Sequence, residues 1–535
     1  MEAPAAGGSA SGQAEQLPAH LDGVTSVVVQ LTAADGTHTG PPVDVPVDAS
    51  PAQLQALVQA LLQAQKGKLE DSDTAPLAFY LDEQEIATNL LDTIASTGGG
   101  VEGTLTVRYH PLAVFRVLPV TRCSDTLPGH SDSVLHVHFS PNGAVMGSAG
   151  GDGMVRMWDT GTNTTKYVCS GHTAHVLCVA FSPCGSMMAS GDFKGQVRVW
   201  DVATGAGIGG PLKGHKSWIT SMAWEPLHSS DSTDGCCTRL ATASKDGAVK
   251  VWAARSGRFL FSCAGHTDSV ESVKWGGDGI LYTGSRDRTV KAWSVTSAAR
   301  GKLIRTLAGH GHRVNCLALS TEAVCRTGPF DHTGAAPADA EAAKRAASAR
   351  YTAVRQLGPE RLVSASDDAT LFLWTPGDGG SKHHLARMAG HQQPVNHIAF
   401  SPDTRLLASA SFDKKVKVWD GFTGAFLMTF TGHVAAVYQV AWSGDSRFLA
   451  SASKDSTVKV WAAPVANAAL AVAASKRDAG SDAATAKLAG PARAGAKAIY
   501  TLSGHADEVF ALDWSPNGEK VASGSRDRTI KIWSH

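Results

Sequence analysis

Four residue types that can do chemistry recur together along this chain. A Gly-His pair is followed by a Ser or Thr, by an Asp four residues after that hydroxyl, and by a Trp six residues after the Asp. Ser, His and Asp are the types that form a nucleophile, its general base and the carboxylate that orients the base. The histidines are His130, His172, His215, His266, His310, His391, His433 and His505. The hydroxyl residues are Ser148, Ser190, Thr242, Thr283, Ser364, Ser409, Ser451 and Ser523. The aspartates are Asp152, Asp246, Asp287, Asp368, Asp413, Asp455 and Asp527. The tryptophans are Trp158, Trp200, Trp252, Trp293, Trp374, Trp419, Trp461 and Trp533.

Eight copies of one arrangement indicate a scaffold rather than an active site. A Trp N–H, a hydroxyl, a His and an Asp form a chain of donors and acceptors that satisfies buried polar groups within one repeat. The second copy, SGDFKGQVRVWD (190–201), has Lys194 where the Asp is expected. Because lysine has no acceptor, we expect the network of this copy to be incomplete, and Lys194→Asp to stabilise the fold by about 1 kcal/mol.

Strands must position these residues. Copies such as SASFDKKVKVWD (409–420) and SASKDSTVKVWA (451–462) alternate apolar and polar residues with period two. The pattern from Gly-His to Trp resembles the WD40 repeat, which implies a propeller blade of four strands for each copy. We therefore expect a mainly β chain in which residues 112–535 form an eight-bladed WD40 propeller, preceded by a small α+β domain.

The last repeat, which ends in SRDRTIKIWSH (525–535), supplies only inner strands. In WD40 proteins the sequence repeat is offset from the blade, so the outer strand of the last blade comes from before the first repeat. We expect AVFRVLPVTRCSDTL (113–127) to provide that strand, to close the ring and to remove the unpaired edge.

Three insertions interrupt the repeats. HSSDSTDGCC (228–237) is a small loop, and residues 325–360 contain a predicted helix over 339–357. The Ala-rich insertion 463–498 has little core-forming content, and we expect it to be flexible.

Composition restricts the class of protein. Lys plus Arg and Asp plus Glu each total 48 among 535 residues, so the formal net charge is zero and any basic surface must be local. Nine cysteines between Cys123 and Cys325 form no CxxC pair. We expect scattered, reduced thiols of a cytosolic or nuclear protein, the adjacent Cys236 and Cys237 included. Residues 1–20 predict a disordered tail rather than a secretory signal, and no apolar run reaches the length of a membrane span.

Residues 21–111 predict a separate domain. Strands are expected over 24–32, 41–49, 76–81 and 103–111, a helix over 50–65 and a short helix over 85–96. Ser50 is the expected N-cap of the first helix and Pro51 its first residue. This order resembles a ubiquitin-like β-grasp domain.

Three carboxylates, Asp82, Glu83 and Glu85, precede the predicted short helix. On spacing alone, Asp82 and Glu85 fit a capping box in which Glu85 completes the N-terminus of that helix.

The stretches PVDVPVD (42–48), PLAFYLDEQEI (76–86), WEPLH (224–228) and GPERLVSASDDATLFLW (358–374) resemble the Notchless family. The resemblance covers roughly residues 24–535 apart from the insertion 463–498. It implies a non-catalytic assembly factor of the large (60S) ribosomal subunit that works in the nucleus, in nucleolus and nucleoplasm. Its implied partners are pre-60S ribosomal proteins, rRNA and other assembly factors, with neither a membrane nor a small-molecule substrate.

The resemblance also gives Glu85 a role. In the family, the ubiquitin-like domain is bound by the metal-ion-dependent adhesion site of midasin, an AAA ATPase whose ATP-driven pulling remodels the particle. Glu85 matches the glutamate that completes the coordination of the Mg²⁺ held by midasin, so the chain has no cofactor of its own and shares that Mg²⁺ at the interface. Mg²⁺ takes oxygen ligands in octahedral geometry, and a carboxylate from a partner fills an open position.

A partner surface is expected on one face of the propeller, where the residue before each repeat Asp tends to lie. Basic residues interleaved with aromatic ones suit contact with an RNA–protein particle. The candidate residues are Phe193, Trp218, Lys245, Arg286, Arg313, Phe412, Tyr438, Lys454, Phe510 and Arg526. The alternatives are a scaffold in Notch-type signalling, a ubiquitin-ligase substrate receptor and an enzyme in the propeller channel. WAAR (252–255) lacks the Asp of the W-D-x-R sequence typical of such receptors.

Overall fold

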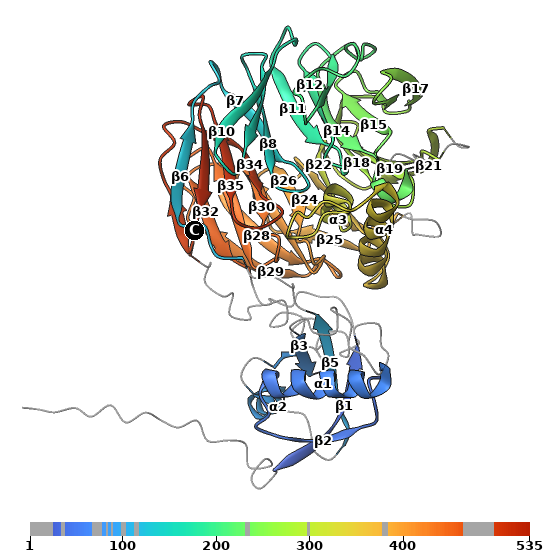
Figure 1. The fold of residues 1–535 in the computed structure, drawn as a ribbon, viewed down its shortest axis with the longest axis vertical. Helices are drawn as coiled ribbons and strands as arrows, with labels where there is room; N and C mark the ends of the chain where they lie inside the picture. The colour runs from blue at the N-terminus through green and yellow to red at the C-terminus, as the bar shows by residue number, and fades with distance from the viewer. Residues whose placement is uncertain are drawn as a thin grey trace, which may run out of the picture. The chain divides into compact units, whose positions relative to one another are not determined.

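The chain divides into two compact units, Met1–Val114 and Phe115–His535 (Figure 1). The computed structural model describes residues 25–33, 38–66, 77–81, 84–86, 89–97, 103–111, 117–230, 236–296, 300–376, 383–463 and 497–535. The predicted tail 1–20 and most of the insertion 463–498 lie outside these ranges. Within them, no helix is long and apolar enough to cross a membrane.

The first unit is an α+β domain built on a five-stranded sheet with the order β2-β1-β5-β3-β4. Strands β1 and β5 run parallel, and the other pairs are antiparallel. Its elements are β1 (Ser26–Ala33), β2 (Val43–Pro46), α1 (Pro51–Lys66), β3 (Leu77–Leu81), β4 (Gln84–Glu85), α2 (Leu90–Thr97) and β5 (Leu105–Pro111). Leu54 and Val58 of α1 are fully buried in one core with Val29 and Phe79 of the sheet. This arrangement confirms the predicted small α+β domain.

The start of α1 follows from its local sequence. The side chain of Gln53 accepts hydrogen bonds from the backbone N–H of Ser50 (2.8 Å) and from its hydroxyl (3.1 Å). Pro51 is the first residue of the helix, where its missing N–H costs nothing.

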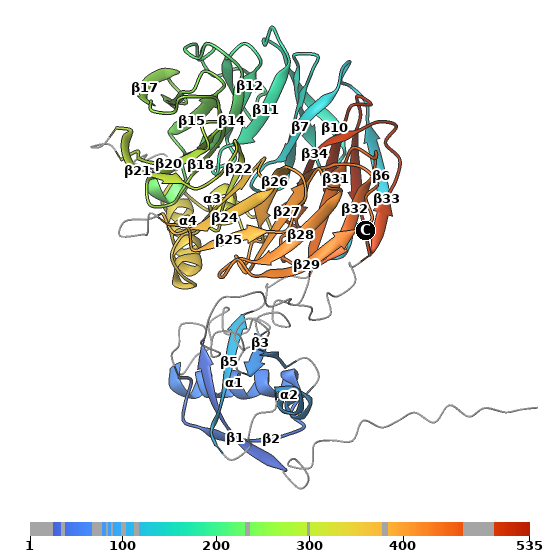
Figure 2. The same cartoon turned by 180° about the vertical axis from the view of Figure 1, so that it is seen from behind.

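The second unit contains eight blades arranged as a ring (Figures 1 and 2). Blade one comprises β7 (Val134–Phe139), β8 (Val145–Gly150), β9 (Val155–Asp159) and β10 (Thr164–Cys169), and blade two comprises β11 (Val176–Phe181), β12 (Met187–Asp192) and β13 (Val197–Asp201). Blade three comprises β14 (Ile219–Trp224), β15 (Arg239–Ser244), β16 (Val249–Ala253) and β17 (Arg258–Cys263). Blade four comprises β18 (Val270–Trp275), β19 (Ile280–Ser285), β20 (Thr289–Ser294) and β21 (Lys302–Ala308). Blade five comprises β22 (Val314–Leu319), β23 (Leu362–Ser366), β24 (Thr370–Trp374) and β25 (Ala386–Ala389), and blade six comprises β26 (Val395–Phe400), β27 (Leu406–Ser411), β28 (Lys415–Asp420) and β29 (Phe426–Thr431). Blade seven comprises β30 (Val437–Trp442), β31 (Phe448–Ser453), β32 (Val458–Ala462) and β33 (Tyr500–Leu502). Blade eight comprises β34 (Val509–Trp514), β35 (Val521–Ser525), β36 (Ile530–Ser534) and β6 (Arg122–Leu127).

Blade two departs from the four-stranded plan. Its sheet has three strands, and the fourth place is taken by two isolated bridges, from Val197 to Leu212 and from Trp200 to Gly207.

Blade eight is completed by the strand that precedes the first repeat, as the sequence predicts. Strand β6 pairs antiparallel with β36, from Leu127 opposite Ile530 to Arg122 opposite Ser534. Figures 1 and 2 show β6 in blue among the red strands of the last repeat. Leu127 and Ile530 share one buried cluster with Val134 of blade one, so the seam is packed as well as hydrogen-bonded.

The predicted polar network is present in all eight blades. Each Trp Nε1 lies 2.8–2.9 Å from its hydroxyl oxygen, and that oxygen lies 2.7–2.9 Å from His Nε2. His Nδ1 lies 2.7–3.1 Å from a carboxylate oxygen. Because a carboxylate only accepts, Nδ1–H donates to it, and Nε2 is left to accept from the hydroxyl. The Trp, hydroxyl, His and Asp groups of each network are thus bonded to one another within the blade, as expected of a scaffold.

The pKa values of these aspartates are lowered from their usual range. Burial alone would raise the pKa of Asp246 and Asp527, but hydrogen bonds from His215 and His505 and from backbone N–H groups outweigh it. The pKa of Asp527 falls to about 2, so the carboxylate stays ionised and continues to accept.

The expectation of an incomplete network in blade two is wrong. Asp192, two residues before Lys194, supplies the carboxylate, with its Oδ2 3.0 Å from Nδ1 of His172. Asp192 also accepts from the backbone N–H groups of Lys194 (2.9 Å) and Gln196 (2.8 Å), and it is fully buried. The acceptor therefore comes from the end of β12 instead of the turn that follows.

This geometry predicts that Lys194→Asp does not stabilise the fold. A second carboxylate beside the buried Asp192 repels it, so the substitution leaves the free energy of unfolding equal or lower. Asp192→Ala leaves His172 Nδ1–H and two backbone N–H groups without an acceptor, and we expect a loss of roughly 3 kcal/mol in urea unfolding.

The paired exchange Asp192→Ser with Lys194→Asp is the matched control. It recreates the arrangement of blade seven, where Asp455 accepts from His433 and Ser453 accepts from the backbone N–H of Asp455. We expect it to recover most of the stability lost in Asp192→Ala. If the exchange is as unstable as the single variant, the role given to Asp192 is wrong.

Candidate functional site

One face of the ring is defined by the turns between the second and third strands of the blades. At eight equivalent turn positions the backbone N–H donates to a carbonyl just before the first strand of the same blade, at 2.8–3.1 Å. The eight positions are Gly151, Phe193, Lys245, Arg286, Asp367, Phe412, Lys454 and Arg526. This shared bond places all eight on one face, which we call the turn face.

An aromatic and basic cluster lies on the turn face at blades two and three. The rings of Phe193 and Trp218 stack with centroids 4.1 Å apart, and Nζ of Lys245 lies 3.9 Å from the centroid of the Trp218 ring. The rings of His175 and Phe193 form an edge-to-face pair with centroids 6.2 Å apart. We call these four residues the Trp218 cluster. A cation held over an indole leaves a flat, partly exposed surface that suits a ring or another cation of a partner.

A second cluster lies on the same face at blades six to eight. Tyr438 contacts Phe412 and Phe510, with centroids 6.2 and 5.6 Å apart, and its hydroxyl donates to Oε2 of Glu508 at 2.9 Å. Burial and the Glu508 carboxylate raise the pKa of Tyr438 to about 12, so the phenol remains a donor. Lys454 pairs with the same Glu508 at 3.4 Å.

The predicted basic residues are largely paired with carboxylates. Arg286 pairs with Glu271, and Arg313 with Asp367. Arg526 lies 3.7 Å from Asp507 and 3.8 Å from Glu508. The turn face therefore carries alternating charges and two aromatic clusters, rather than the basic and aromatic surface that the sequence suggests. Its use as a partner surface stays a prediction.

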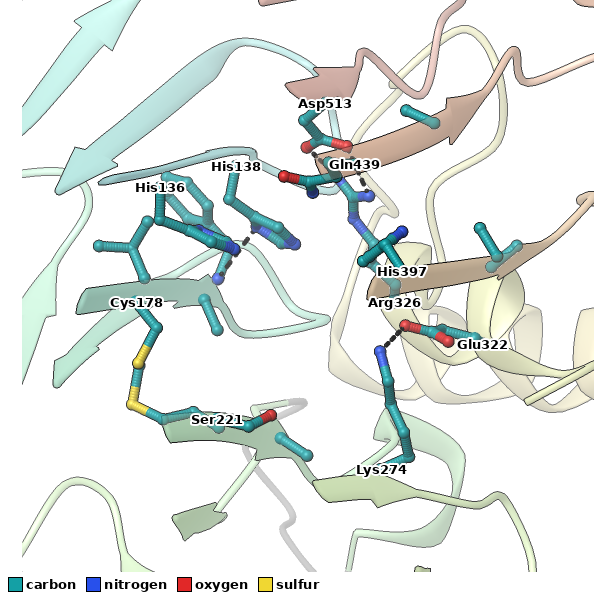
Figure 3. Close-up of a pocket in the computed structure, with 18 of the residues that line it drawn as sticks. His136, His138, Cys178, Ser221, Lys274, Glu322, Arg326, His397, Gln439 and Asp513 are labelled. Atoms are coloured by element: carbon teal, nitrogen blue, oxygen red, sulfur yellow. Dashed lines mark hydrogen bonds and ion pairs between the residues drawn. The ribbon is translucent and has the colours of Figure 1, made fainter. Parts of the chain in front are cut away.

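The ring encloses a channel with a cavity of about 390 Å³ (Figure 3). His136 and His138 of β7, Lys274 of β18 and His397 of β26 line it. Segment 320–361, the insertion between β22 and β23, contributes α3 (Glu322–Thr327) to the same cavity. This role of the insertion was not predicted from the sequence.

Ion pairs hold α3 in the channel. Glu322 pairs with Lys274 of blade four, and Arg326 donates to Asp513 of blade eight, with Nη1 3.0 Å from Oδ1 (Figure 3). These charged side chains of α3 are thus each paired with a residue of a blade.

The rest of the insertion extends over neighbouring blades. Helix α4 (Ala340–Gln356) matches the predicted helix 339–357, and Asp339 caps it by accepting from Ala342 N–H at 2.6 Å. Tyr351 stacks on His228, which lies in the short 3₁₀ helix η2 (Leu227–Ser229) of blade three, with ring centroids 4.2 Å apart. Blade five is therefore tied to blades three and eight in addition to its ring neighbours, blades four and six.

The channel histidines predict acid sensitivity. Burial lowers the pKa of His136 to about 4 and that of His397 to about 3, with Lys274 adding to both shifts and Asp513 opposing the first. Both rings take up a proton near pH 6.5 in the unfolded chain. Between these values the unfolded chain binds more protons, so stability falls as the pH drops below about 6.5, by up to ~1.4 kcal/mol per pH unit for each ring. Urea unfolding at pH 7 and pH 5 measures the loss.

Substituting both rings identifies the source of that loss. His136→Asn with His397→Asn should shrink the difference between pH 7 and pH 5, whereas His383→Asn, at an exposed position, should leave it unchanged. A double variant that loses as much as the parent would show that other groups cause the acid sensitivity.

Glu85 lies in the first unit, in the two-residue edge strand β4, where it pairs with Tyr80 of β3. The next residue, Ile86, is buried, and its N–H donates to Phe79 O at 2.8 Å. Helix α2 begins at Leu90, so the capping box between Asp82 and Glu85 is wrong, as is the predicted helix start at 85. Asp82 and Glu83 lie outside the described residues. The metal-reaching role of Glu85 stays a prediction.

Three cysteines expected to be scattered lie together. Cys184 of blade two packs in one cluster with Cys237 of blade three, and the hydroxyl oxygen of Ser186 lies 3.1 Å from Sγ of Cys184 and 3.7 Å from Sγ of Cys236. Their distance in sequence hides this contact, and only the CC pair gave a local signal. Among the described residues, no group of three or more His, Cys, Asp or Glu has the geometry to hold a metal ion.

Comparison with known families agrees with the two-unit architecture. The model for "WD domain, G-beta repeat" matches residues 121–159, 163–201, 209–253, 257–294, 382–420, 424–462 and 496–534. The repeat that this family model does not match is that of blade five, which the insertion 320–361 interrupts. The "NLE (NUC135) domain" model matches residues 27–94. The crystal structure of the computationally designed Ika8 protein shares the fold, with a TM-score of 0.54 and 24% identity over 77% of this chain and 100% of that one.

These features define a WD40 β-propeller protein with an N-terminal NLE domain. The chain is 46% identical to "Protein Notchless" of Drosophila melanogaster over 71% of this chain and 76% of that one. It is 45% identical to "Notchless protein homolog" of Arabidopsis thaliana, over 76% and 82% of the two chains. It is 40% identical to "Ribosome assembly protein 4" of Saccharomyces cerevisiae, over 76% and 80%. The chain belongs to the Notchless family.

Proposed function

We propose that this protein is a non-catalytic assembly factor of the large ribosomal subunit that works in the nucleus, in nucleolus and nucleoplasm. The propeller docks on the pre-60S particle, and the N-terminal domain is held by the metal-ion-dependent adhesion site of midasin. The observation that carries the proposal is the relationship, at 40% identity over most of both chains, to a yeast relative named a ribosome assembly protein. A second relative of that name, from Chaetomium thermophilum, is also 40% identical.

The structure supports a role in which force passes through the chain. A pull on the N-terminal domain would reach the propeller through the chain that precedes β6. There Val117 and Val120 are buried in the core of blades seven and eight, and Val117 N–H donates to Oδ2 of Asp445 at 2.8 Å. The entry point is thus anchored before the load reaches the β6–β36 ladder.

The turn face supplies the docking surface in this proposal. Aromatic rings that are partly exposed and held in place by neighbours lose little conformational entropy on binding, which is typical of residues that dominate an interface. The Trp218 cluster and the second cluster, formed by Phe412, Tyr438 and Phe510, both have this character. The paired charges around them suit a mixed protein and RNA partner better than a bare phosphate backbone.

Sedimentation tests the docking proposal. In a sucrose gradient the parent protein should co-sediment with pre-60S particles and be absent from mature 80S ribosomes. Phe193→Ala with Trp218→Ala removes the stacked pair and should weaken docking by roughly 30-fold or more, the effect of losing an interface anchor of about 2 kcal/mol.

Leu303→Ala is the control, because Leu303 is an exposed apolar residue on the outer strand β21. It should leave sedimentation unchanged. A parent protein that stays near the top of the gradient would favour the alternative of a signalling scaffold or a ubiquitin-ligase receptor. Arg255, the last residue of the receptor-like WAAR sequence, donates to Sγ of Cys236 at 3.2 Å.

Substitution of Glu85 tests the metal contact. Glu85→Asp shortens the reach by one methylene, and Glu85→Gln keeps the shape but is a poor ligand for Mg²⁺. We expect both to abolish binding to midasin in Mg²⁺ and to act dominantly by trapping pre-60S particles, since the propeller still docks. Pull-down with midasin and the gradient profile measure the two effects.

Asp44→Asn is the matched control, since it neutralises an exposed carboxylate on β2, at the opposite edge of the same sheet. It should bind midasin as the parent does. Normal binding by Glu85→Gln would move the metal role to Asp82 or Glu83, or remove it.

A further inference from the structure

Three cysteines meet where blade two contacts blade three. Cys184 lies in the turn between β11 and β12, and Cys236 and Cys237 lie just before β15. The hydroxyl oxygen of Ser186 lies 3.1 Å from Sγ of Cys184 and 3.7 Å from Sγ of Cys236, so one small group touches both sulfur atoms. We call these three cysteines the sulfur cluster.

The surroundings of the sulfur cluster distinguish its members. Cys184 and Cys236 are partly exposed, whereas Cys237 is fully buried in the core of blades two and three. Ser182 Oγ lies 3.2 Å from Sγ of Cys184, and a guanidinium nitrogen of Arg255 donates to Sγ of Cys236 at 3.2 Å. Cys184 and Cys236 are therefore the two that small solutes reach.

Hydrogen bonds make the thiols of the sulfur cluster differ in reactivity. Hydrogen bonds from the thiols of Cys236 and Cys237 lower the pKa of Cys184 far below its usual range, and Ser182 and Ser186 add to this effect. The same contact with Cys184, together with burial, raises the pKa of Cys236. Burial raises the pKa of the isolated Cys169 to about 11 and that of Cys178 to about 12. Since the thiolate is the nucleophile, Cys184 is the thiol poised to react first.

We propose that Cys184 and Cys236 are a redox modification site that a peroxide converts to a reversible disulfide between blades two and three. The Cys184 thiolate attacks one oxygen of hydrogen peroxide, which becomes a sulfenic acid on Cys184 and releases hydroxide that takes up a proton to form water. The Cys236 sulfur then attacks the Cys184 sulfur, the S–O bond breaks, and the departing hydroxide takes the Cys236 proton as a second water. Two thiols and one peroxide thus give one disulfide and two waters.

The bond would fasten a seam that the insertion 320–361 also contacts. Cys237 packs with Ala343 and Ala347 of α4, and Lys344 of the same helix donates to the carbonyl of Ser230. Ser230 in turn donates to the carbonyl of Cys236 at 3.2 Å. Oxidation would therefore stiffen blades two and three together with the segment that reaches the channel.

The first test is peptide mapping of the full-length protein after treatment with one equivalent of hydrogen peroxide. Under non-reducing conditions we expect a single cross-link, between Cys184 and Cys236, which dithiothreitol reverses, and a rise of a few degrees in the melting temperature of the oxidised protein. Cys184→Ser and Cys236→Ser should each abolish the cross-link. Cys237→Ser should retain it, and so should Cys123→Ser, which removes an exposed cysteine outside the cluster.

The second test needs no variant and therefore does not depend on how substitutions fold. With iodoacetamide at pH 7, Cys184 of the parent protein should be alkylated at least tenfold faster than the exposed Cys123. Faster alkylation of Cys123 would overturn the proposal. So would a cross-link between the adjacent Cys236 and Cys237, a link from Cys184 to Cys237, or disulfides only between molecules.

Discussion

The ladder between β6 and β36 is the contact on which the rest of the propeller depends. Without it, the outer edge of β36 would be unpaired, and blades one and eight would meet only through side chains. The ladder is reinforced on both sides, because Thr121 N–H donates to Ser534 O at 2.9 Å and Leu127 packs beside Val134 of blade one. It also lies close in sequence to the start of the second unit at Phe115.

Repetition of the His–Asp network explains how the loops are free to vary. Each blade satisfies the hydrogen-bonding groups of its own buried Trp, hydroxyl and His. The conformation of the turn that carries Phe193 or Lys245 therefore depends little on which side chain is exposed there. The same autonomy lets blade five carry the insertion 320–361 without losing its fold. The exposed turn residues and the insertion 320–361 are thus additions to a scaffold that stays constant from blade to blade.

Much of this fold follows from periodic signals in the sequence. Strand alternation, the Gly-His pairs and the repeated Trp predict eight blades, and the offset of the repeat predicts β6. Two local predictions were wrong for physical reasons. At Lys194 the acceptor comes from Asp192, because a carboxylate at the end of β12 reaches the same histidine. At Glu85 the spacing of a capping box is met in a strand, since the following Ile86 is buried in the sheet core and the helix begins only at Leu90.

Contacts between distant segments could not be read from the sequence. The approach of Cys184 to Cys236, the ion pair of Arg326 with Asp513 and the pairing of the predicted basic residues with carboxylates all join residues from different strands or blades. No local pattern encodes such contacts, because they depend on how strands distant in sequence are placed in the folded ring.

Deletion of residues 117–127 tests ring closure most directly. The truncated protein should lose stability across the whole propeller and melt in one transition, roughly 5–10 °C below the parent, for a loss of about 5 kcal/mol. A synthetic peptide of the deleted sequence, added in excess, should bind the open edge of β36 and restore much of the melting temperature, while a scrambled peptide should not. A truncated protein that melts with the parent, or that ignores the matching peptide, would contradict the account.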